Sequence, residues 1–196
     1  MAQAVNGSQA RDTPQAHGTD GGDPDAGAVP DLETLRRRVR ALERGAGPEA
    51  TSVLQLGAPA IDDLLPGGGL ARAGVHELLP ERTAWDDGPA AGFALAIAGR
   101  LMAAANGPVL WIARRGDLYP PGTPAFGVDP DRLLSACAGD DAGVLWAMEE
   151  ALRCPELAGV VGEVGQLDRT AARRLQLAAE AGQVMGLTLL RRRVVP

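Results

Sequence analysis

From about residue 50 onward the chain alternates short apolar segments with longer segments of helix-forming residues, and this alternation constrains its fold more than any other feature. Apolar runs of strand length, such as residues 157–164, indicate strands that are buried on both faces. Strands that alternate with helices in this way imply a parallel sheet, covered by helices on both faces and joined by right-handed connections. We therefore expect residues 50–196 to form one α/β domain of this kind.

The expected segment boundaries follow from proline, glycine and capping residues. We expect strands at residues 53–56, 75–79, 108–113, 133–136, 157–164 and 184–190. We expect a helical turn over residues 59–65 and helices over residues 89–105, from Asp140 or Asp141 to about Arg153, and from Asp168 to about Ala181. Loops are expected over residues 80–88 and around Pro120, Pro121 and Pro124.

Two shorter regions precede this domain. Residues 1–30 contain almost no large apolar side chains, so they cannot offset the entropy cost of ordering, and we expect a disordered tail. Residues 31–45 predict an amphipathic helix, because apolar side chains recur at helical spacing at Leu32, Leu35, Val39 and Leu42. The polar face of this helix carries Arg36, Arg37 and Arg40. The helix is expected either to dock on its own domain or to contact a partner or DNA through those arginines.

Composition argues against several classes of protein. The formal net charge of −6 argues against a generally basic nucleic-acid-binding protein. Cys137 and Cys154 match neither a metal-binding spacing nor a disulfide framework, which favours a reducing cytoplasm. No apolar run approaches the roughly 20 residues of a membrane span. The N-terminus lacks the basic and apolar regions of a signal peptide. We therefore expect a cytoplasmic protein that does not contact membranes.

Several stretches resemble known proteins. Residues 56–70 are similar to the segment by which RecA-like proteins enter their core, and residues 76–78 are similar to the strand before a phosphate loop. More specifically, the chain resembles the ImuA family, the RecA-like proteins of bacterial damage-inducible mutagenesis, at residues 108–111, 127–133, 146–153, 159–164 and 173–180. The similarity covers about residues 31–190. It implies a RecA-like α/β fold, with a mainly parallel sheet between helices.

The resemblance also implies a function and a set of partners. It implies an accessory protein of the SOS-type DNA damage response that helps to assemble an error-prone translesion synthesis complex. The implied partners are ImuB, a relative of Y-family polymerases, and an error-prone polymerase of the DNA polymerase III alpha type, with RecA as a further candidate. Contact with DNA and the nucleoid would then be indirect. Members of the family usually carry a further C-terminal segment, which we expect this chain to lack.

A RecA-like core normally binds ATP through a phosphate loop, and the chain lacks the residues that this loop needs. The loop pattern requires a lysine for the β- and γ-phosphates and a hydroxyl for Mg²⁺, yet the chain contains no lysine. The best match is residues 88–94, where Gly88 and Gly92 are spaced one residue short of the pattern, Phe93 stands where lysine belongs and Ala94 replaces the hydroxyl. We therefore expect no ATPase activity and no cofactor. Weak nucleotide binding at Gly88 and Gly92 remains open, because backbone N–H groups at the start of the following helix can attract an anion.

Other candidate residues lie where strands are expected to end. Glu163 ends an apolar strand at the position of a Mg²⁺-associated acid, and without the lysine and hydroxyl we expect it to serve a structural or partner-facing role. Arg114 and Arg115 follow another strand, where RecA-type ATPases have a carboxylate that orients water. They are interpreted as solvated charges or as contacts to an acidic partner or nucleic-acid phosphate, and the same alternatives apply to Arg173 and Arg174.

Two other functions stay open at this stage. The first is a divergent ATPase that becomes active only when a partner subunit supplies the missing lysine or an arginine. The second is a DNA-binding module that uses Arg36, Arg37 and Arg40 together with Arg173 and Arg174, with an affinity that falls steeply with salt.

Overall fold

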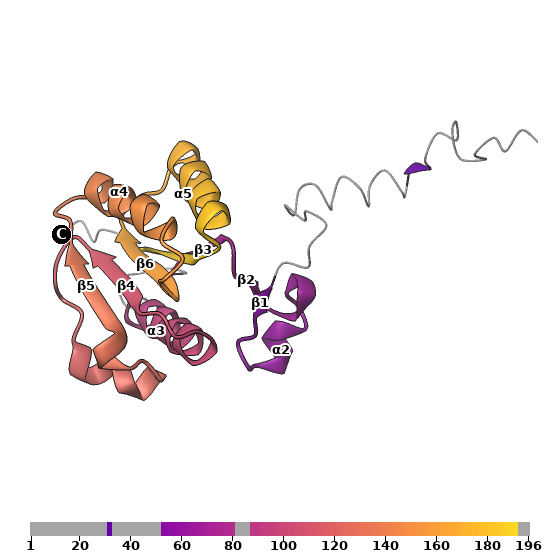
Figure 1. Cartoon of the computed structure of the whole chain (residues 1–196), viewed down its shortest axis with the longest axis horizontal. Helices are drawn as coiled ribbons and strands as arrows, with labels where there is room; N and C mark the ends of the chain where they lie inside the picture. The colour runs from indigo at the N-terminus through magenta and orange to yellow at the C-terminus, as the bar shows by residue number, and fades with distance from the viewer. Residues whose placement is uncertain (1–30, 33–51, 81–86, 192–196) are drawn as a thin grey trace, which may run out of the picture. The chain divides into compact units, whose positions relative to one another are not determined.

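Five parallel strands form the central sheet, in the spatial order β3, β7, β6, β4, β5 (Figure 1). Their bounds are Val75–Leu78 for β3, Met185–Leu190 for β7, Gly159–Val164 for β6, Val109–Ala113 for β4 and Leu133–Cys137 for β5. Every residue of β6 is buried, and so are the first five residues of β7. This burial on both faces is what the continuous apolar runs predict. The predicted parallel sheet is confirmed.

The computed structural model describes residues 31–32, 52–80 and 87–191 of the chain. The chain divides into two units, Met1–Gly45 and Ala46–Pro196. Asp31 and Leu32 are the described residues of the first unit, and Leu32 is helical and exposed. The predicted tail at residues 1–30 and the remainder of the predicted helix, including Arg36, Arg37 and Arg40, lie outside the described residues.

Helices cover both faces of the sheet. The helix α3, Asp87–Ala104, lies on one face, and the helices α4, Asp141–Leu152, and α5, Arg169–Gly182, lie on the other (Figure 1). The reason is the direction in which the chain crosses the sheet. It goes from β3 to β4 and on to β5 at the far side, and then comes back to β6 and β7. Because the connections are right-handed, reversing this direction moves the helices to the opposite face.

The strand residues alternate between two hydrophobic clusters. Trp111 of β4 packs in the α3 cluster with Leu101 and Leu187, whereas Ile112 packs in the α4 and α5 cluster with Met148. Successive side chains of a strand point to opposite faces, so each strand contributes to both cores. Burial of this apolar area stabilises the sheet by roughly 25 cal/mol per Å².

Local sequence signals fix the starts of α4 and α5. The Asp140 side chain accepts a hydrogen bond from the backbone N–H of Gly143 at 2.8 Å, and Asp168 accepts one from Ala171 at 2.8 Å. Each aspartate thereby satisfies one of the N–H groups that a helix start leaves without an internal partner. The predicted cap at Asp168 is confirmed, and of the two alternatives at the start of α4 the structure selects Asp140.

The first predicted strand does not join the main sheet. The strand β1, Val53–Leu54, pairs antiparallel with β2, Leu70–Ala71, in a separate two-stranded sheet. The intervening segment holds the short helix α2, Pro59–Asp62, and a 3-10 turn, η1, at Pro66–Gly68. The buried Asp62 carboxylate accepts hydrogen bonds at 2.7–3.1 Å from the backbone N–H groups of Leu56, Gly57 and Ala58. These bonds hold the turn between β1 and α2.

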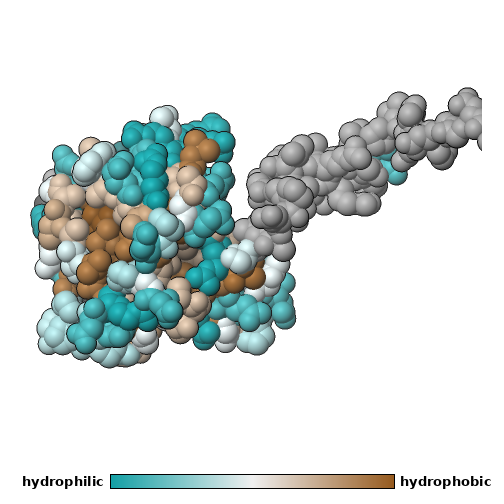
Figure 2. All heavy atoms as spheres, in the orientation of Figure 1, coloured by the Kyte–Doolittle hydropathy of each residue, from teal (hydrophilic) through white to brown (hydrophobic). Residues whose placement is uncertain are grey.

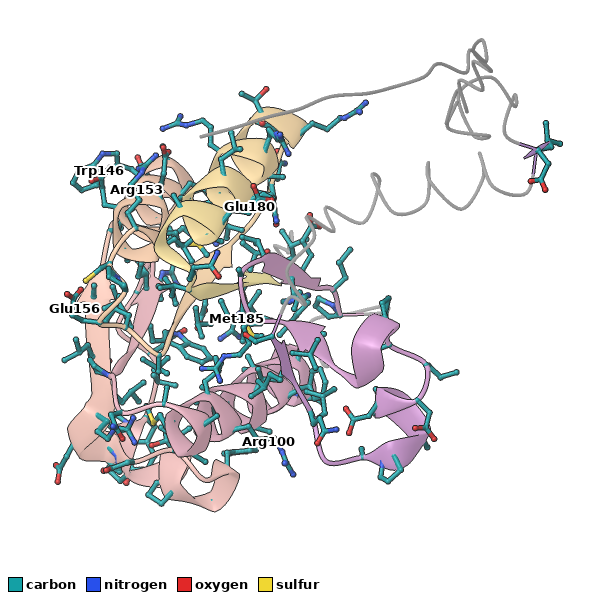
Figure 3. The ribbon with its side chains drawn as sticks, turned by 45° about the vertical axis from the view of Figure 1, so that its right-hand side comes forward. Arg100, Trp146, Arg153, Glu156, Glu180 and Met185 are labelled. Atoms are coloured by element: carbon teal, nitrogen blue, oxygen red, sulfur yellow. The ribbon has the colours of Figure 1, made fainter. Side chains whose placement is uncertain are left out.

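Gly57 allows this turn to lie against α3. Its φ of +72° is a left-handed conformation that favours glycine, and a β-carbon at this position would overlap the guanidinium of Arg100. Figure 3 shows Arg100 on the side of α3 that faces the α2 segment. A side chain at residue 57 would therefore strain the backbone and force the end of the Arg100 side chain to move.

The connection between β4 and β5 is built from 3-10 turns, because its prolines cannot continue an α-helix. These turns are η3, Pro120–Phe126, and η4, Pro130–Arg132. The guanidinium of Arg132 donates hydrogen bonds to the carbonyl oxygens of Met102, Ala105 and Gly107 at 2.9, 2.5 and 2.6 Å. A cation at the C-terminus of a helix satisfies carbonyl groups that have no partner and interacts favourably with the helix dipole. Arg132 therefore fixes the end of α3.

We predict that Arg132→Ala lowers the free energy of unfolding by about 2–3 kcal/mol, because hydrogen bonds to a charged group contribute about 1.5–3 kcal/mol and three partners are lost. Arg132→Lys should recover only part of this loss, since an ammonium cannot reproduce the planar fork of donors. Urea denaturation measures both values. The matched control is Arg115→Ala, at an exposed position, where a change within about 0.5 kcal/mol is expected. Equal effects at the two positions would contradict the assignment.

Candidate functional site at the carboxyl edge of the sheet

The carboxyl ends of the parallel strands meet at one edge of the sheet, where open α/β domains bind their ligands. Glu163 lies one residue before the end of β6, Arg114 directly follows β4, and Arg191 directly follows β7. The starts of α4 and α5 lie at the same edge, because each helix returns antiparallel to the strand before it. Several of the predicted site residues are therefore gathered at this edge.

Glu163 is the centre of this site, and its carboxylate is already paired within the chain. The residue is buried, with 6% of its surface exposed. The indole N–H of Trp111 donates to its Oε1 atom at 2.7 Å, and the Nε–H of Arg191 donates to its Oε2 atom at 2.8 Å. The backbone N–H of Arg191 also donates to the carbonyl of Val164 at 2.8 Å. These contacts join the middle of β4 to the carboxyl ends of β6 and β7.

This pairing decides the chemistry open to Glu163. A buried carboxylate is costly unless it is hydrogen-bonded and its charge is balanced. In a nucleotide-binding site a metal ion or its water shell would supply that charge, whereas here Arg191 supplies it from within the chain. Both carboxylate oxygens already accept a hydrogen bond within the chain. A structural or partner-facing role for Glu163 stays a prediction.

The residues predicted as a phosphate loop are helical. Helix α3 begins at Asp87, so Gly88 and Gly92 lie in its first two turns. The helix predicted over residues 89–105 is thereby confirmed, with a start two residues earlier. N–H groups beyond the first turn of a helix are bonded to carbonyls within it, so those after the first turn of α3 cannot surround a phosphate. A β-carbon at residue 92 would lie 3.1 Å from the Phe126 ring, so Gly92 also lets Phe126 pack against α3. Nucleotide binding by Gly88 and Gly92 stays a prediction, and residues 81–86 lie outside the described residues.

The two arginines after β4 have different environments. The Nε of Arg114 lies 3.3 Å from Oδ1 of Asp141, whose Oδ2 accepts a hydrogen bond from the backbone N–H of Gly165 at 3.0 Å. Arg114 therefore ties the end of β4 to the start of α4 and to the loop after β6. Arg115 is exposed and stays a candidate for contact with a partner or phosphate.

Arg174 is paired with a carboxylate on the neighbouring helix. Its guanidinium forms an ion pair with Glu149 of α4, and Arg153 contacts Glu149 at 2.8 Å and Glu150 at 3.3 Å. These two arginines lower the pKa of Glu149, with the hydrogen bond from Arg153 as the largest cause. Figure 2 shows a mainly hydrophilic surface over α4 and α5. Arg173 is exposed on α5, and its predicted contact with a partner is not tested by this arrangement.

Two residues of the site were missed by the sequence analysis. Trp111 lies in a segment that was predicted only as a buried strand, and Arg191 lies one residue beyond the last predicted strand. The alternation of side chains along each strand could have indicated that the two residues meet, because Trp111 of β4 and Glu163 of β6 both face α3. The order of the strands is needed before this signal can be used, because 52 residues separate the two side chains in sequence.

The described residues give little support for metal or membrane binding. Within residues 31–32, 52–80 and 87–191, no group of three or more potential metal-ligating side chains comes together. No helix in that same part of the chain is both long enough and apolar enough to cross a membrane.

Comparison with known structures defines the class of protein. The chain is similar to the RadB recombinase, with a TM-score of 0.50 and 17% identity over 69% of each chain. It is also similar to SulA from Pseudomonas aeruginosa, with a TM-score of 0.50 and 25% identity over 59% of this chain and 96% of that one. Together with the parallel sheet between helices, the likeness to RadB shows that this is a RecA-like α/β protein.

Sequence comparison then gives the family. The chain is 40% identical over 143 residues to the protein ImuA of two Caulobacter vibrioides strains, a match that covers 72% of this chain. The chain belongs to the ImuA family. It spans 59% of the length of these curated relatives. No protein-family model matches the chain.

We predict that Arg191→Ala lowers the free energy of unfolding by about 3–5 kcal/mol, because it leaves the buried Glu163 carboxylate without its cation. Adding Glu163→Gln should recover part of this loss, since a neutral amide needs no counter-charge. A double-mutant cycle measured by urea denaturation gives the coupling between the two side chains. Additive effects of the two substitutions would show that the pair is not coupled.

We also predict a specific acid dependence for the ion pairs of Glu149. The pKa of Glu149 is lowered in the folded chain, so its contribution to stability is present above the carboxyl pKa of the unfolded chain and is lost as pH falls through the folded pKa. In Glu149→Gln, stability should therefore fall less between neutral and acidic pH than in the unmodified chain. Thermal denaturation at a series of pH values measures this difference, and parallel curves for the two proteins would contradict it.

Proposed function

We propose that this chain is a non-catalytic RecA-like accessory protein of the SOS-type DNA damage response. In this proposal it helps to assemble an error-prone translesion synthesis complex. Its partners would be ImuB and an error-prone polymerase of the DNA polymerase III alpha type, with RecA as a further partner. Membership of the ImuA family supports the choice of pathway and partners.

The observation that carries the non-catalytic part is the pairing of Glu163 with Arg191 and Trp111. Phosphoryl transfer needs cations placed around the transferring group and the metal ion. In this chain, the carboxylate best placed to approach such a metal is bound to the chain's own guanidinium, and there is no lysine anywhere in the sequence to hold the phosphates. A fold with this edge is suited to present surfaces to other proteins rather than to hydrolyse ATP.

The same proposal accounts for the charge of the chain. With a net charge of −6, the chain as a whole does not attract DNA. Location in the cytoplasm, with contact to the nucleoid through partners, follows from the proposed complex. The exposed Arg115 and Arg173 are then available for acidic surfaces of those partners.

We predict that the purified chain shows no Mg²⁺-dependent ATP turnover, alone or with ImuB, and that it retains ImuB in a pull-down. A coupled phosphate-release assay measures the first property. Gly88→Asp is the diagnostic variant, because a side chain at residue 88 meets no other atom within 4 Å and would add negative charge at the start of α3. Turnover that depends on ImuB and disappears in Gly88→Asp would favour the partner-dependent ATPase instead.

The pull-down has its own matched variants. Substituting Arg36, Arg37 and Arg40 together by alanine tests the predicted helix, and substituting Arg115 and Arg173 by alanine tests the exposed arginines of the domain. Loss of ImuB retention in one set would locate the partner contact there. Failure of the unmodified chain to retain ImuB would overturn the assembly role.

A further inference from the structure

The outer surface of α4 and α5 carries an exposed tryptophan. Trp146 of α4 is 63% exposed, whereas Trp111 of β4 is buried in the core. Figure 3 shows Trp146 and Arg153 at the outer side of α4. Tryptophan and arginine are enriched among the few side chains that dominate the binding energy of protein interfaces. Trp146 is therefore a candidate contact residue.

Ion pairs fix the surroundings of Trp146. Glu149 and Glu150 follow it by one helical turn, at a spacing that makes residues neighbours on a helix surface. Both carboxylates contact Arg153, and Glu149 also pairs with Arg174 of α5. The charged groups beside the indole are thus already oriented in the free chain. This lowers the entropy cost of ordering side chains when a partner binds.

The first turns of α5 carry an unfavourable concentration of positive charge. Arg169, Arg173 and Arg174 fall within its first six residues, and apart from the cap Asp168 no acidic residue accompanies them in the first turn. Arg169 and Arg173 are exposed and make no ion pair with another residue in the described part of the chain. Like charges four residues apart on a helix repel each other, and cations are unfavourable near a helix N-terminus.

This arrangement of α5 indicates a function rather than a contribution to stability. Places where a sequence breaks a local rule are expected to be functional sites, and a carboxylate from another molecule would relieve the repulsion. An apolar side chain lies beside the arginines, because Leu177 follows Arg173 and Arg174 by one turn and is 47% exposed. The surface therefore combines cations with apolar contact area.

We propose that the α4–α5 surface, defined by Trp146, Arg169, Arg173 and Leu177, docks a segment of a partner protein that carries both carboxylates and apolar side chains. The carboxylates would pair with the two arginines, while the apolar side chains contact the indole and Leu177. This inference rests on the proposed function, because the partner would be ImuB of the proposed complex.

Single-stranded DNA fits this surface less well. An exposed aromatic ring near arginines can stack on a base. However, the Glu149 and Glu150 carboxylates lie one turn from Trp146 and would repel the phosphates of a nucleic acid. Glu150 is itself exposed, with 58% of its side-chain surface accessible. A mixture of charges around an aromatic side chain favours a protein partner.

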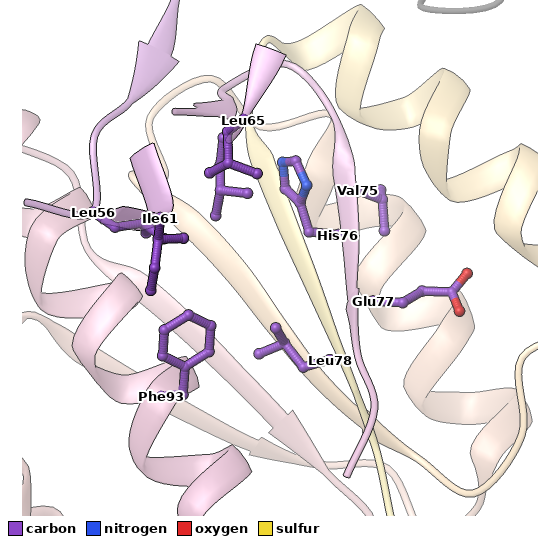
Figure 4. Close-up of a pocket in the computed structure, with 9 residues that line it drawn as sticks. Leu56, Ile61, Leu65, Val75, His76, Glu77, Leu78 and Phe93 are labelled. Atoms are coloured by element: carbon purple, nitrogen blue, oxygen red, sulfur yellow. The ribbon is translucent and has the colours of Figure 1, made fainter. Parts of the chain in front are cut away.

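The first test measures the affinity of the full chain for purified ImuB by biolayer interferometry in about 150 mM NaCl. Trp146→Ala should weaken binding about tenfold or more, as expected for a central aromatic contact. The matched control is Phe93→Ala, a helical aromatic residue that is 42% exposed. Phe93 belongs to α3, on the opposite face of the sheet, and lines an apolar pocket of about 450 Å³ beside β3 (Figure 4). The control should bind ImuB as the unmodified chain does.

The second test separates binding from stability at one arginine. Arg173→Glu should weaken ImuB binding about tenfold and reduce its dependence on salt, whereas Arg173→Lys, which keeps the charge, should bind within about threefold of the unmodified chain. Arg173→Glu also replaces repulsion from Arg169 by attraction, so its Tm should rise by about 1–3 °C. Weaker binding by a more stable chain would exclude damage to the fold as the cause.

The possible results distinguish this inference from the proposed function. Failure of the unmodified chain to bind ImuB would overturn both. ImuB binding that is unchanged in Trp146→Ala or in Arg173→Glu would overturn the docking surface and leave the assembly role standing. The docking surface would also be overturned if Trp146→Ala abolished saturable binding of fluorescein-labelled oligothymidine, or self-association in analytical ultracentrifugation, since DNA or a second copy would then be the occupant.

Discussion

The carboxyl edge of the sheet depends on the need to neutralise one buried carboxylate. Glu163 has lost almost all contact with water, and in such surroundings its charge requires donors at both oxygens and a nearby cation. Trp111 and Arg191 supply these from the two neighbouring strands. The same contacts therefore hold β4, β6 and β7 together and satisfy a carboxylate that could otherwise attract a metal ion. Stability of this edge and the engagement of the Glu163 carboxylate are two consequences of one arrangement.

The arginines of this chain form distinct structural pairs. Arg132 holds the end of α3 through three carbonyl groups, Arg114 joins the end of β4 to the start of α4, and Arg174 joins α5 to α4. A planar guanidinium with several fixed donors is suited to contacts of this kind, and a lysine could not make them equally well. The lysine-free composition is thus compatible with a well-connected RecA-like fold even though it lacks the phosphate-binding residue of nucleotide-hydrolysing relatives.

The proposed adaptor role depends on the surface of the fold rather than on the carboxyl edge of the sheet. That edge is occupied by ion pairs and hydrogen bonds within the chain. We infer that the exposed Arg115 and Arg173 are among the side chains available for assembly.

The sequence by itself determined the parallel α/β class, the bounds of most strands and helices, and the cap of α5, because these depend on neighbouring residues and on apolar runs that only a two-sided sheet can bury. At the start of α4 it left Asp140 and Asp141 as alternatives. It also showed that the lysine of a phosphate loop is absent. It placed the start of α3 within two residues, at Pro89 rather than Asp87. It could not show that β1 pairs with β2, that Trp111 and Arg191 meet Glu163, or that a pocket lies beside β3. Those features join residues far apart in the chain, and only the order of the strands in the folded sheet brings them together.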